Sequence, residues 1–510
     1  MTDWMQALAE QYRSARRRCL DDDLVLVFEI DDTILDMRHM VRHVLLEYDR
    51  VHATRFFYGL AVEDLERHDN RIEKLLEGFD VPSAAGGSIL EWCRSRSWSH
   101  QAVLASHRPF RGVLEIIRWF QLQPGTRVGL NTGRTERLRQ ETLDCLNALG
   151  SEYRVVFDSD LLYMRPHRDM SILDAKAEGI RWFREQGHRV FAVVDNEPEN
   201  IAAMAAADPD GEILFMHADT LFASQRRELP RTVSGTEYDL TRLIPERGGL
   251  PGHVQLVWHG VNDLANLHRF LASPVSWGES DVRRDPLDRL VLRDDSFETT
   301  AWNRDEDLLT LDECLRQYRY ADKGIKLDLK EGGETVTRVL DTLKSTGVDP
   351  QRVWFNGSLA NLGHDDFTRL AESCPSAVIQ CPVGFMAPLV KALPEQARTV
   401  LETLRGWGVN RFSIDWRIEC RVRMFEQLDA WGYEVNFYNV PDLAGFLRAA
   451  LLLPRSLTAD FNFPEWNFFG RGSGKGGVHH EYLRSGQDLD PVPLLRHNDG
   501  YASISRARGT

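Results

Sequence analysis

Short apolar runs that end abruptly in polar residues recur along this chain, and the first of them is the clearest. Residues 24–35, LVLVFEIDDTIL, place five apolar residues before Glu29, Asp31 and Asp32. A run of this length predicts a buried parallel strand, and ligands of open α/β sheets bind beyond the carboxyl ends of such strands. Carboxylates crowded at a strand end repel one another unless a cation or a proton intervenes, and Mg²⁺ prefers oxygen ligands. The pattern therefore predicts a magnesium site, with an ordinary acidic turn as the alternative.

Two more runs in the first half end in the same way. Residues 126–132, TRVGLNT, end at Thr132, and residues 190–195, VFAVVD, end at Asp195. We expect both runs to be strands of the α/β domain that residues 24–35 begin.

Helical patterns fill the segments between these runs. Residues 37–120 are rich in Arg, Glu, Leu and aromatic side chains, which predicts a helical cap inserted after the first strand, or else a simple helical insertion. Caps close over a site and select the substrate. Lys176 lies at the start of the helical pattern AKAEGIRWFREQG, where a solvated lysine is the ordinary interpretation.

Beyond residue 252 the pattern changes to a regular alternation of strand-like runs and helical segments. Eight such runs within about 200 residues predict a (β/α)₈ barrel. The connection between the second and third runs is too short for a helix, so we expect an imperfect barrel. The eight runs are residues 254–259, 275–282, 289–293, 324–330, 353–357, 377–383, 411–416 and 434–440.

Ionisable residues gather at the predicted strand ends of this barrel, which is where the sites of such barrels lie. Glu279 and Asp281 are two residues apart, so a strand would place them on the same side, and with Asp328 they predict a site for Mg²⁺ or Ca²⁺. His259 is a candidate general acid or base, and a core histidine is the alternative. Lys330 is either a functional cation or an ion-pair partner within the barrel.

Proline, glycine and charged residues cluster in residues 223–252, where we place the domain boundary. The predicted organisation is an α/β domain over 1–222, a linker over 223–252, a barrel over 253–455 and an irregular tail over 456–510.

Composition narrows the classes of function. A chain of 510 residues with 43% hydrophobic and 27% charged residues is typical of a globular protein of two or more domains. A net charge of −15 argues against nucleic acid or an anionic membrane as partner. Seven scattered cysteines without a CxxC pair predict neither a disulfide framework nor a zinc knuckle. No run is long enough to span a membrane, and we expect a reduced, cytoplasmic compartment.

The first half resembles the haloacid dehalogenase-like (HAD) phosphatase superfamily over about residues 24–222. Its first motif, Asp-x-Asp-x-Thr after an apolar strand, is matched by Glu29-Ile30-Asp31-Asp32-Thr33, with Glu29 in the place of the nucleophilic aspartate. Glutamate is one methylene longer than aspartate, and the geometry of attack is sensitive to shifts of about 1 Å. The resemblance therefore implies a slow phosphatase or a phosphate-binding relic.

The same resemblance implies a Rossmannoid fold with a helical cap and a role for each matched residue. Mg²⁺ would be held by Glu29, by the carbonyl of Asp31 and by Asp195, with Glu199 as a second candidate. Asp31 would be the general acid/base, and Thr132 and Lys176 would bind the phosphate.

The second half resembles the glycerophosphodiester phosphodiesterase-like superfamily of (β/α)₈ barrels, and the menorin family within it most closely. The superfamily pattern runs His, then Glu-x-Asp, then His-Asp, then Glu-x-Lys. Arg293 stands where the superfamily has its second catalytic histidine; arginine cannot shuttle a proton at neutral pH, although it can grip a phosphate. The matching segments here are His259, Glu279-Ser280-Asp281-Val282, Arg293-Asp294 and Asp328-Leu329-Lys330, and those that resemble menorin are 258–262 and 323–330.

These observations predict a metal-dependent phosphoric-ester hydrolase in which a phosphodiesterase-like barrel is fused to a HAD-like phosphatase domain. The expected partner is a small phosphorylated or phosphodiester substrate. The departures at Glu29 and Arg293 favour a single working domain beside a degenerate one, ahead of a bifunctional enzyme. A non-enzymatic phospho-ligand sensor or scaffold is the alternative.

Overall fold

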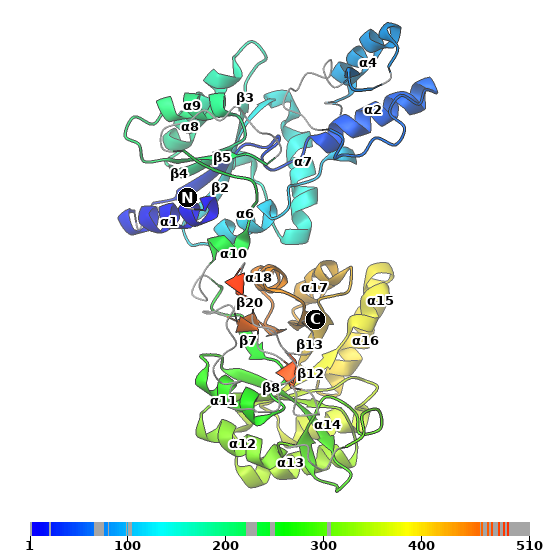
Figure 1. Ribbon diagram of the computed structural model, residues 1–510. Coiled ribbons are helices and arrows are strands. Elements are labelled where there is room, and N and C mark those ends of the chain that lie inside the picture. Colours follow the sequence, from blue (N-terminus) through cyan, green and yellow to red (C-terminus); the bar gives the residue numbers. More distant parts are fainter. Residues whose placement is uncertain are drawn as a thin grey trace, which may run out of the picture. The chain divides into compact units, whose positions relative to one another are not determined.

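The computed structural model describes residues 3–459 and six two-residue strands between 461 and 488. The gaps within 3–459 are 20–21, 66–75, 80, 98, 100–101, 103–104, 221–231, 245–249 and 303–307. The chain divides into two compact units, Met1–Ile244 and Pro245–Thr510 (Figure 1). The predicted fold class, an α/β Rossmannoid unit followed by a (β/α)₈ barrel, is confirmed.

The first unit is built on a parallel sheet in the order β3-β2-β1-β4-β5-β6. Its strands are β1 (Leu24–Phe28), β2 (Thr126–Thr135), β3 (Leu162–Arg165), β4 (Arg189–Asp195), β5 (Leu214–Ala218) and β6 (Thr232–Gly235). Its helices are α1 (Trp4–Arg18), α2 (Arg38–His52), α4 (Ser83–Arg96), α6 (Val113–Gln121), α7 (Arg139–Gly150), α8 (Ile172–Glu185), α9 (Pro198–Ala206) and α10 (Leu240–Leu243).

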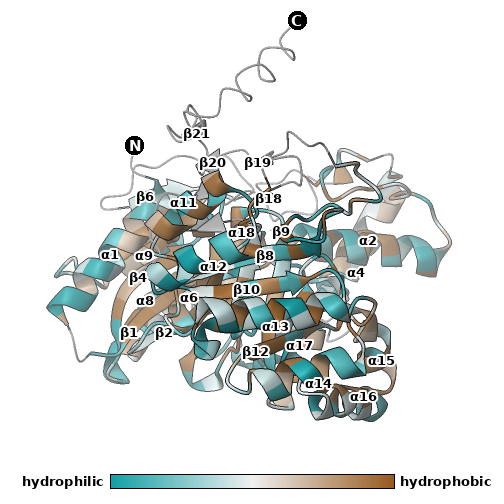
Figure 2. Ribbon diagram, turned by 90° about the horizontal axis from the view of Figure 1, so that it is seen from below, coloured by the Kyte–Doolittle hydropathy of each residue, from teal (hydrophilic) through white to brown (hydrophobic). Residues whose placement is uncertain are grey.

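Helices cover both faces of this sheet. Val25 and Val27 of β1 share one apolar cluster with side chains of α8 and α9. On the other side, the ring of Tyr12 in α1 contacts Phe120 of α6 and Phe191 of β4 at centroid distances of 5.4 and 5.5 Å. Because both faces are covered, all five residues of β1 are buried. The hydropathy colouring of Figure 2 shows that this strand is apolar.

A helical insertion follows β1, but it is shorter than the predicted cap over 37–120. Helices α2 and α4 pack around an apolar cluster of their own, to one side of the sheet (Figure 1). Helix α6 instead packs on β2, and six of its nine residues are apolar and buried. Two paired segments connect the insertion to the sheet: the N–H of Asp36 donates to the carbonyl of Arg108, and the N–H of Phe110 to that of Ile34.

The first unit also extends beyond residue 222, into the segment predicted as a linker. Strand β6 pairs with β5, and the indole of Trp4 donates a hydrogen bond to the carbonyl of Glu237 at 2.8 Å. The strand sequence, TVSG, has no apolar run, so the local pattern predicted a loop.

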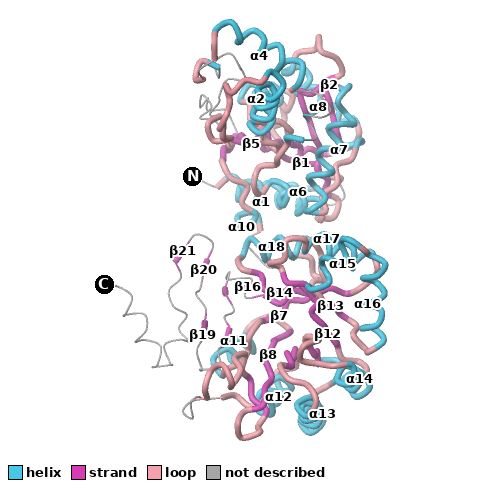
Figure 3. The backbone as a smooth tube through the Cα atoms, turned by 90° about the vertical axis from the view of Figure 1, so that its right-hand side faces the viewer, coloured by secondary structure: helices cyan, strands magenta, loops and turns pink. Residues whose placement is uncertain are grey.

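The second unit is a closed barrel of eight parallel strands in the order β7-β8-β10-β11-β12-β13-β14-β15, with β15 paired back to β7. Figure 3 shows these strands surrounded by helices. The strands are β7 (Gln255–Trp258), β8 (Trp277–Arg284), β10 (Gly324–Leu329), β11 (Val353–Asn356), β12 (Val378–Pro382), β13 (Arg411–Asp415), β14 (Glu434–Val440) and β15 (Ser456–Ala459). The helices are α11 (Leu264–Ala272), α12 (Leu311–Tyr320), α13 (Glu334–Thr346), α14 (His364–Ser373), α15 (Ala387–Ala392), α16 (Pro394–Gly406), α17 (Arg421–Ala430) and α18 (Leu443–Leu451).

Two predictions about the strands of the barrel are corrected. The run at 289–293 forms β9 (Leu290–Leu292), which pairs antiparallel with β8 as a hairpin and is not a barrel strand. The eighth barrel strand is β15, in the segment predicted as tail. Its four residues, SLTA, are all buried, but half of them are polar, so the local pattern carried no strand signal. Within the described residues no helix is both long and apolar enough to cross a membrane.

Candidate functional site

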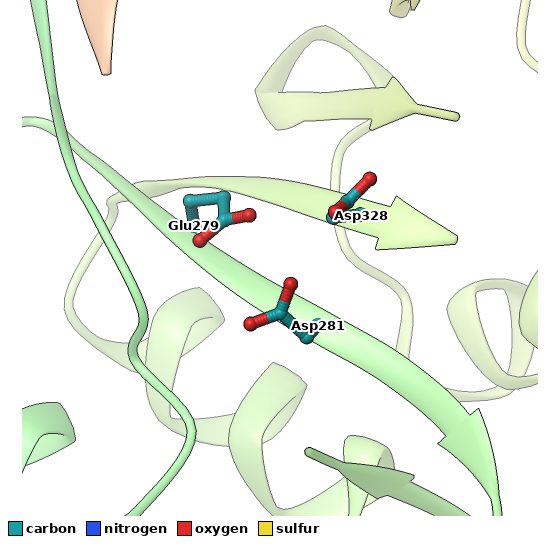
Figure 4. A group of neighbouring side chains, drawn as sticks. All are labelled: Glu279, Asp281 and Asp328. Atoms are coloured by element: carbon teal, nitrogen blue, oxygen red, sulfur yellow. The ribbon is translucent and has the colours of Figure 1, made fainter. Parts of the chain in front are cut away.

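Three carboxylates meet near the carboxyl ends of two barrel strands. Glu279 and Asp281 come from β8 and Asp328 from β10, where Asp328 is the register partner of Asp281. One oxygen of each side chain lies within 4.8 Å of the other two, and all three side chains stand on the same side of the strands (Figure 4). In the part of the chain that the structure describes, no other three acids, histidines or cysteines gather so closely. The structure thus brings together the three acids that the sequence selected.

Burial separates the acidities of the two β8 carboxylates. Burial raises the pKa of Glu279 to about 7, and the charge of Asp281 adds to the rise. Burial would also raise the pKa of Asp281, but the charge of Lys330 and hydrogen bonds from Lys330 and Asn262 outweigh it and lower that pKa to about 2. The two carboxylates therefore differ in acidity, because the pKa of Glu279 is raised and that of Asp281 is lowered.

Lys330 is the cation nearest to these acids. Its Nζ lies 2.8 Å from Asp281 Oδ1, 2.6 Å from Asp328 Oδ2 and 3.0 Å from Asp294 Oδ1. Burial would lower the pKa of Lys330, but the three carboxylates outweigh it and raise the pKa above its usual value. The lysine is thus an ion-pair partner at the barrel rim, and its role as a functional cation stays a prediction.

His259 and two amides complete the rim. His259 Nε2 lies 3.8 Å from Glu279 Oε2, and the backbone N–H of Gly260 donates to the same oxygen at 2.9 Å. Asn262 Nδ2 donates to Asp281 Oδ2, and Asn356 Nδ2 to Asp328 Oδ1, both at 2.6 Å. These bonds orient the carboxylates toward one another without neutralising them.

A second lysine of this site was missed by the sequence reasoning. Lys326 is fully buried in β10, where its Nζ donates to Thr458 Oγ1 at 2.9 Å. Burial lowers its pKa, against the charges of Glu279 and Asp328, which raise it. The spacing of Lys326 could have revealed its place in the site. Lys326 precedes Asp328 by two residues, and residues two apart on a strand face the same side.

Arg293 organises the loop that follows β9. The side chain is fully buried and donates hydrogen bonds to the carbonyls of Asp295 and Thr300 at 3.2 and 3.1 Å, and its guanidinium stacks over Phe297. Its contact with a phosphate stays a prediction.

Four residues matched to the HAD pattern in the sequence form one buried ionic cluster: Glu29 directly after β1, Thr132 and Asp195 in the sheet, and Lys176 in α8. The ammonium of Lys176 contacts the carboxylate of Glu29 and lies 2.6 Å from Asp195 Oδ2. It also donates to the carbonyl of Asn131 at 2.8 Å, and Thr132 Oγ1 donates to Glu29 Oε1 at 3.0 Å. Lys176 is 1% exposed, so the interpretation as a solvated helix lysine is wrong.

Asp31 stands apart from this cluster and has a partner that the sequence reasoning missed. Arg134 binds its carboxylate through both Nη2, at 2.6 Å, and Nε, at 3.1 and 3.2 Å. Arg134 also donates to Thr142 Oγ1 at 3.1 Å, which fixes the guanidinium. The only sequence signal is its position two residues after Thr132 at a strand end.

The other candidate acids of the first unit differ in their surroundings. Asp32, in the left-handed region with φ of 56°, has its pKa raised to about 7 by burial and by the charge of Asp31. Asp195 accepts from the N–H of Glu197 at 2.9 Å and from Asn200 Nδ2 at 3.2 Å. Glu199, the second candidate ligand, is exposed in the first turn of α9.

The described geometry can be set beside that of known proteins. No protein-family profile matches the chain, and the comparison with curated proteins finds no relative. Among solved structures, a phosphodiesterase from Oleispira antarctica in complex with the product sn-glycerol-3-phosphate is similar at 18% identity, over 41% of this chain and 93% of its own, with a TM-score of 0.32. A glycerophosphodiester phosphodiesterase from Agrobacterium tumefaciens is similar at 14% identity, over 40% and 95%, with a TM-score of 0.30. A HAD-superfamily hydrolase from Geobacter sulfurreducens is similar at 13% identity, over 42% and 92%, with a TM-score of 0.28. The closer likeness to the menorin family stays a prediction.

Proposed function

We propose that the barrel is a metal-dependent phosphodiesterase and that the HAD-like unit binds a phosphorylated ligand with slow turnover or none. The meeting of Glu279, Asp281 and Asp328 beside a histidine and a lysine carries the first half of this proposal. Buried carboxylates this close together are costly unless a cation lies among them. Lys330 neutralises part of that charge. Burial, with the charge of Asp281 added, still raises the pKa of Glu279 to about 7.

The donor set suits a hard divalent cation. Three carboxylates from two rigid strands offer only oxygen ligands, which Mg²⁺ and Ca²⁺ prefer. Glu279, Asp281 and Asp328 would hold the ion, and when bound it would polarise a phosphoryl oxygen and offset its negative charge.

Side chains of the protein provide the other two parts of the reaction, charge stabilisation and proton transfer. Lys330, held by three carboxylates, presents a fixed positive charge to the phosphoryl group. His259 takes a proton from the attacking water or gives one to the leaving alcohol, and its contact with Glu279 orients the ring. Because Arg293 cannot transfer a proton, His259 acts without a second histidine, which would cost about 10²–10⁴-fold in rate.

The ionic contacts of the first unit favour binding over turnover there. Arg134 engages the carboxylate of Asp31, the expected acid/base, and Lys176 links Glu29 to Asp195. A carboxylate engaged by a bidentate guanidinium is not free to contact a substrate, because its oxygens already accept from Arg134. A bound phosphate would still find Thr132 and Lys176 nearby.

Hydrolysis of two chromogenic esters by the full chain tests the proposal. We expect bis(4-nitrophenyl) phosphate to be cleaved with Mg²⁺ or Ca²⁺ and not with EDTA, and 4-nitrophenyl phosphate to be cleaved far more slowly. Glu279→Gln should lower diester cleavage by about 10²-fold or more, whereas Asp365→Asn, a charge-matched change at an exposed residue of α14, should not. Diester cleavage that survives both EDTA and Glu279→Gln, or no cleavage at all with either metal, would overturn it.

A further inference from the structure

Helix α2 carries two faces of opposite character. Met40, Val44, Leu45 and Tyr48 are buried in the apolar cluster of the insertion. The residues on its other side follow one another at helical spacing and line a cavity of about 330 Å³. They are His39, Arg42, His43, Leu46, Glu47 and Arg50.

The opposite wall of the cavity is the segment that returns from the insertion to the sheet. Ala105, Ser106 and Arg108 line it. The N–H of Asp36 donates to the carbonyl of Arg108 at 2.8 Å, which holds this wall beside the start of α2. The cavity thus lies within the first unit, and none of its lining residues belongs to the cluster around Lys176.

The charge of the lining is positive in a chain of net charge −15. Three arginines and one glutamate leave a formal charge of +2 while both histidines are neutral. Glu47 lies 3.7 Å from the guanidinium of Arg50 and 4.0 Å from that of Arg96, so it is shared with an arginine outside the lining. Burial lowers the pKa of His39, with Asp36 opposing this and the charges of Arg108, Arg38 and Arg42 lowering it further.

Hydrogen bonds to backbone carbonyls hold two of these arginines in position. Arg42 Nε donates to the carbonyl of Leu60 at 2.7 Å, and Arg108 Nη1 donates to the carbonyl of His107 at 2.7 Å. A guanidinium held in this way loses little rotational freedom when it binds an oxyanion, and its planar fork suits phosphate. The volume lies at the lower end of the range for small-molecule sites, which is about 300–1,000 Å³.

We propose that this cavity is a binding site for a small phosphate-bearing anion, held by Arg42 and Arg108 with Arg50, His39 and His43 around it. The site is separate from the barrel acids and from the Lys176 cluster, so it stands whether or not either of these turns over a substrate.

Calorimetric titration of the full chain with pyrophosphate and with inorganic phosphate tests the proposal. EDTA is present throughout, so that neither anion can bind through a divalent cation at the barrel acids. Removing one charge-assisted hydrogen bond costs about 1.5–3 kcal/mol, so Arg42→Gln and Arg108→Gln should each weaken pyrophosphate binding by about tenfold to hundredfold. Arg17→Gln, at an exposed position of α1, makes the same charge change away from the cavity and should leave binding unchanged.

Arg42→Gln removes the hydrogen bond to the carbonyl of Leu60 and could unfold the insertion. Arg50→Gln is the second variant, because the side chain of Arg50 is 73% exposed and its replacement should not disturb the fold. This variant should weaken binding by several-fold while the melting temperature stays the same. Equal binding by wild type and by the cavity variants, or no binding by the wild type at millimolar concentration, would overturn the site. Citrate binding as tight as that of pyrophosphate would overturn the assignment to phosphate.

Discussion

Asp281 and Asp328 are register partners on β8 and β10, and the ammonium of Lys330 lies 2.8 Å from the first and 2.6 Å from the second. Two carboxylates on neighbouring strands would repel each other at this depth, and one lysine from the end of β10 relieves both. The same arrangement leaves Glu279 without an equally close ammonium, which is why its pKa is the one that burial raises to about 7. This division of charge leaves the three rim carboxylates only partly neutralised, which is what the proposed cation site requires.

Replacing Lys330 tests how much this division matters for stability. Lys330→Met leaves buried acids without their cation, and breaking a buried ion pair from one side costs about 3–5 kcal/mol. We expect a loss of that size in urea unfolding at pH 7 in EDTA. The double variant Lys330→Met/Asp281→Asn should lose less, because one of the unpaired charges is gone. Lys344→Met, on the exposed side of α13, is the control, and equal losses for it and Lys330→Met would contradict the prediction.

An aspartate at position 29, as in the first motif of the HAD superfamily, should not by itself give phosphatase activity. Glu29→Asp corrects the side-chain length, but Arg134 still engages the carboxylate of Asp31. We expect the full chain with Glu29→Asp to hydrolyse 4-nitrophenyl phosphate no faster than wild type, and Glu29→Asp/Arg134→Gln to hydrolyse it faster in Mg²⁺. A strong gain from Glu29→Asp alone would show that Arg134 does not restrain Asp31.

His107 should make the first unit sensitive to acid. Burial lowers its pKa to about 4, and the charge of Arg134 lowers it further, against Asp31. In the unfolded chain the pKa of a histidine is about 6.5. Between about pH 6.5 and 4, therefore, His107 is protonated in the unfolded state and neutral in the folded state. The free energy of unfolding should therefore fall by about 3 kcal/mol as the pH drops from 6.5 to 4.

The contribution of His107 is isolated by comparison with a variant that cannot titrate. His107→Gln should flatten the pH dependence of urea unfolding over this range, whereas His167→Gln, at an exposed position, should not. A pH dependence that is the same in wild type and His107→Gln would assign the acid sensitivity to other groups.

The extent of the first unit can be tested with fragments. A fragment ending at residue 244 keeps β6, the bond from Trp4 to Glu237, and Tyr238, whose hydroxyl donates to the carbonyl of Thr33 at 3.0 Å. A fragment ending at residue 222 loses all three and leaves the edge of β5 open, which favours aggregation. We expect the longer fragment to melt cooperatively at a higher temperature. Equal melting temperatures would place β6 and the Tyr238 contact outside the stabilising core.

The sequence by itself determined where polar residues interrupt the apolar runs and therefore which of them could meet. The apolar run before Glu29 predicted β1 because a strand covered on both faces has no polar positions. The spacing of Glu279 and Asp281 predicted their common side because strands alternate with a period of two. Each of these signals lies within a short stretch of sequence, so it can be recognised without knowledge of the tertiary structure.

Only the tertiary structure decided how distant segments pair. Strand β15 closes the barrel although SLTA has no strand signal, because the position between β14 and β7 buries it. The contact of Arg134 with Asp31 joins residues 103 apart, and the meeting of Lys176 with both Glu29 and Asp195 depends on three separate elements. The cation-lined cavity likewise needs Arg108 beside α2. Such contacts depend on register and packing, which set the distances between side chains and which no single stretch of sequence contains.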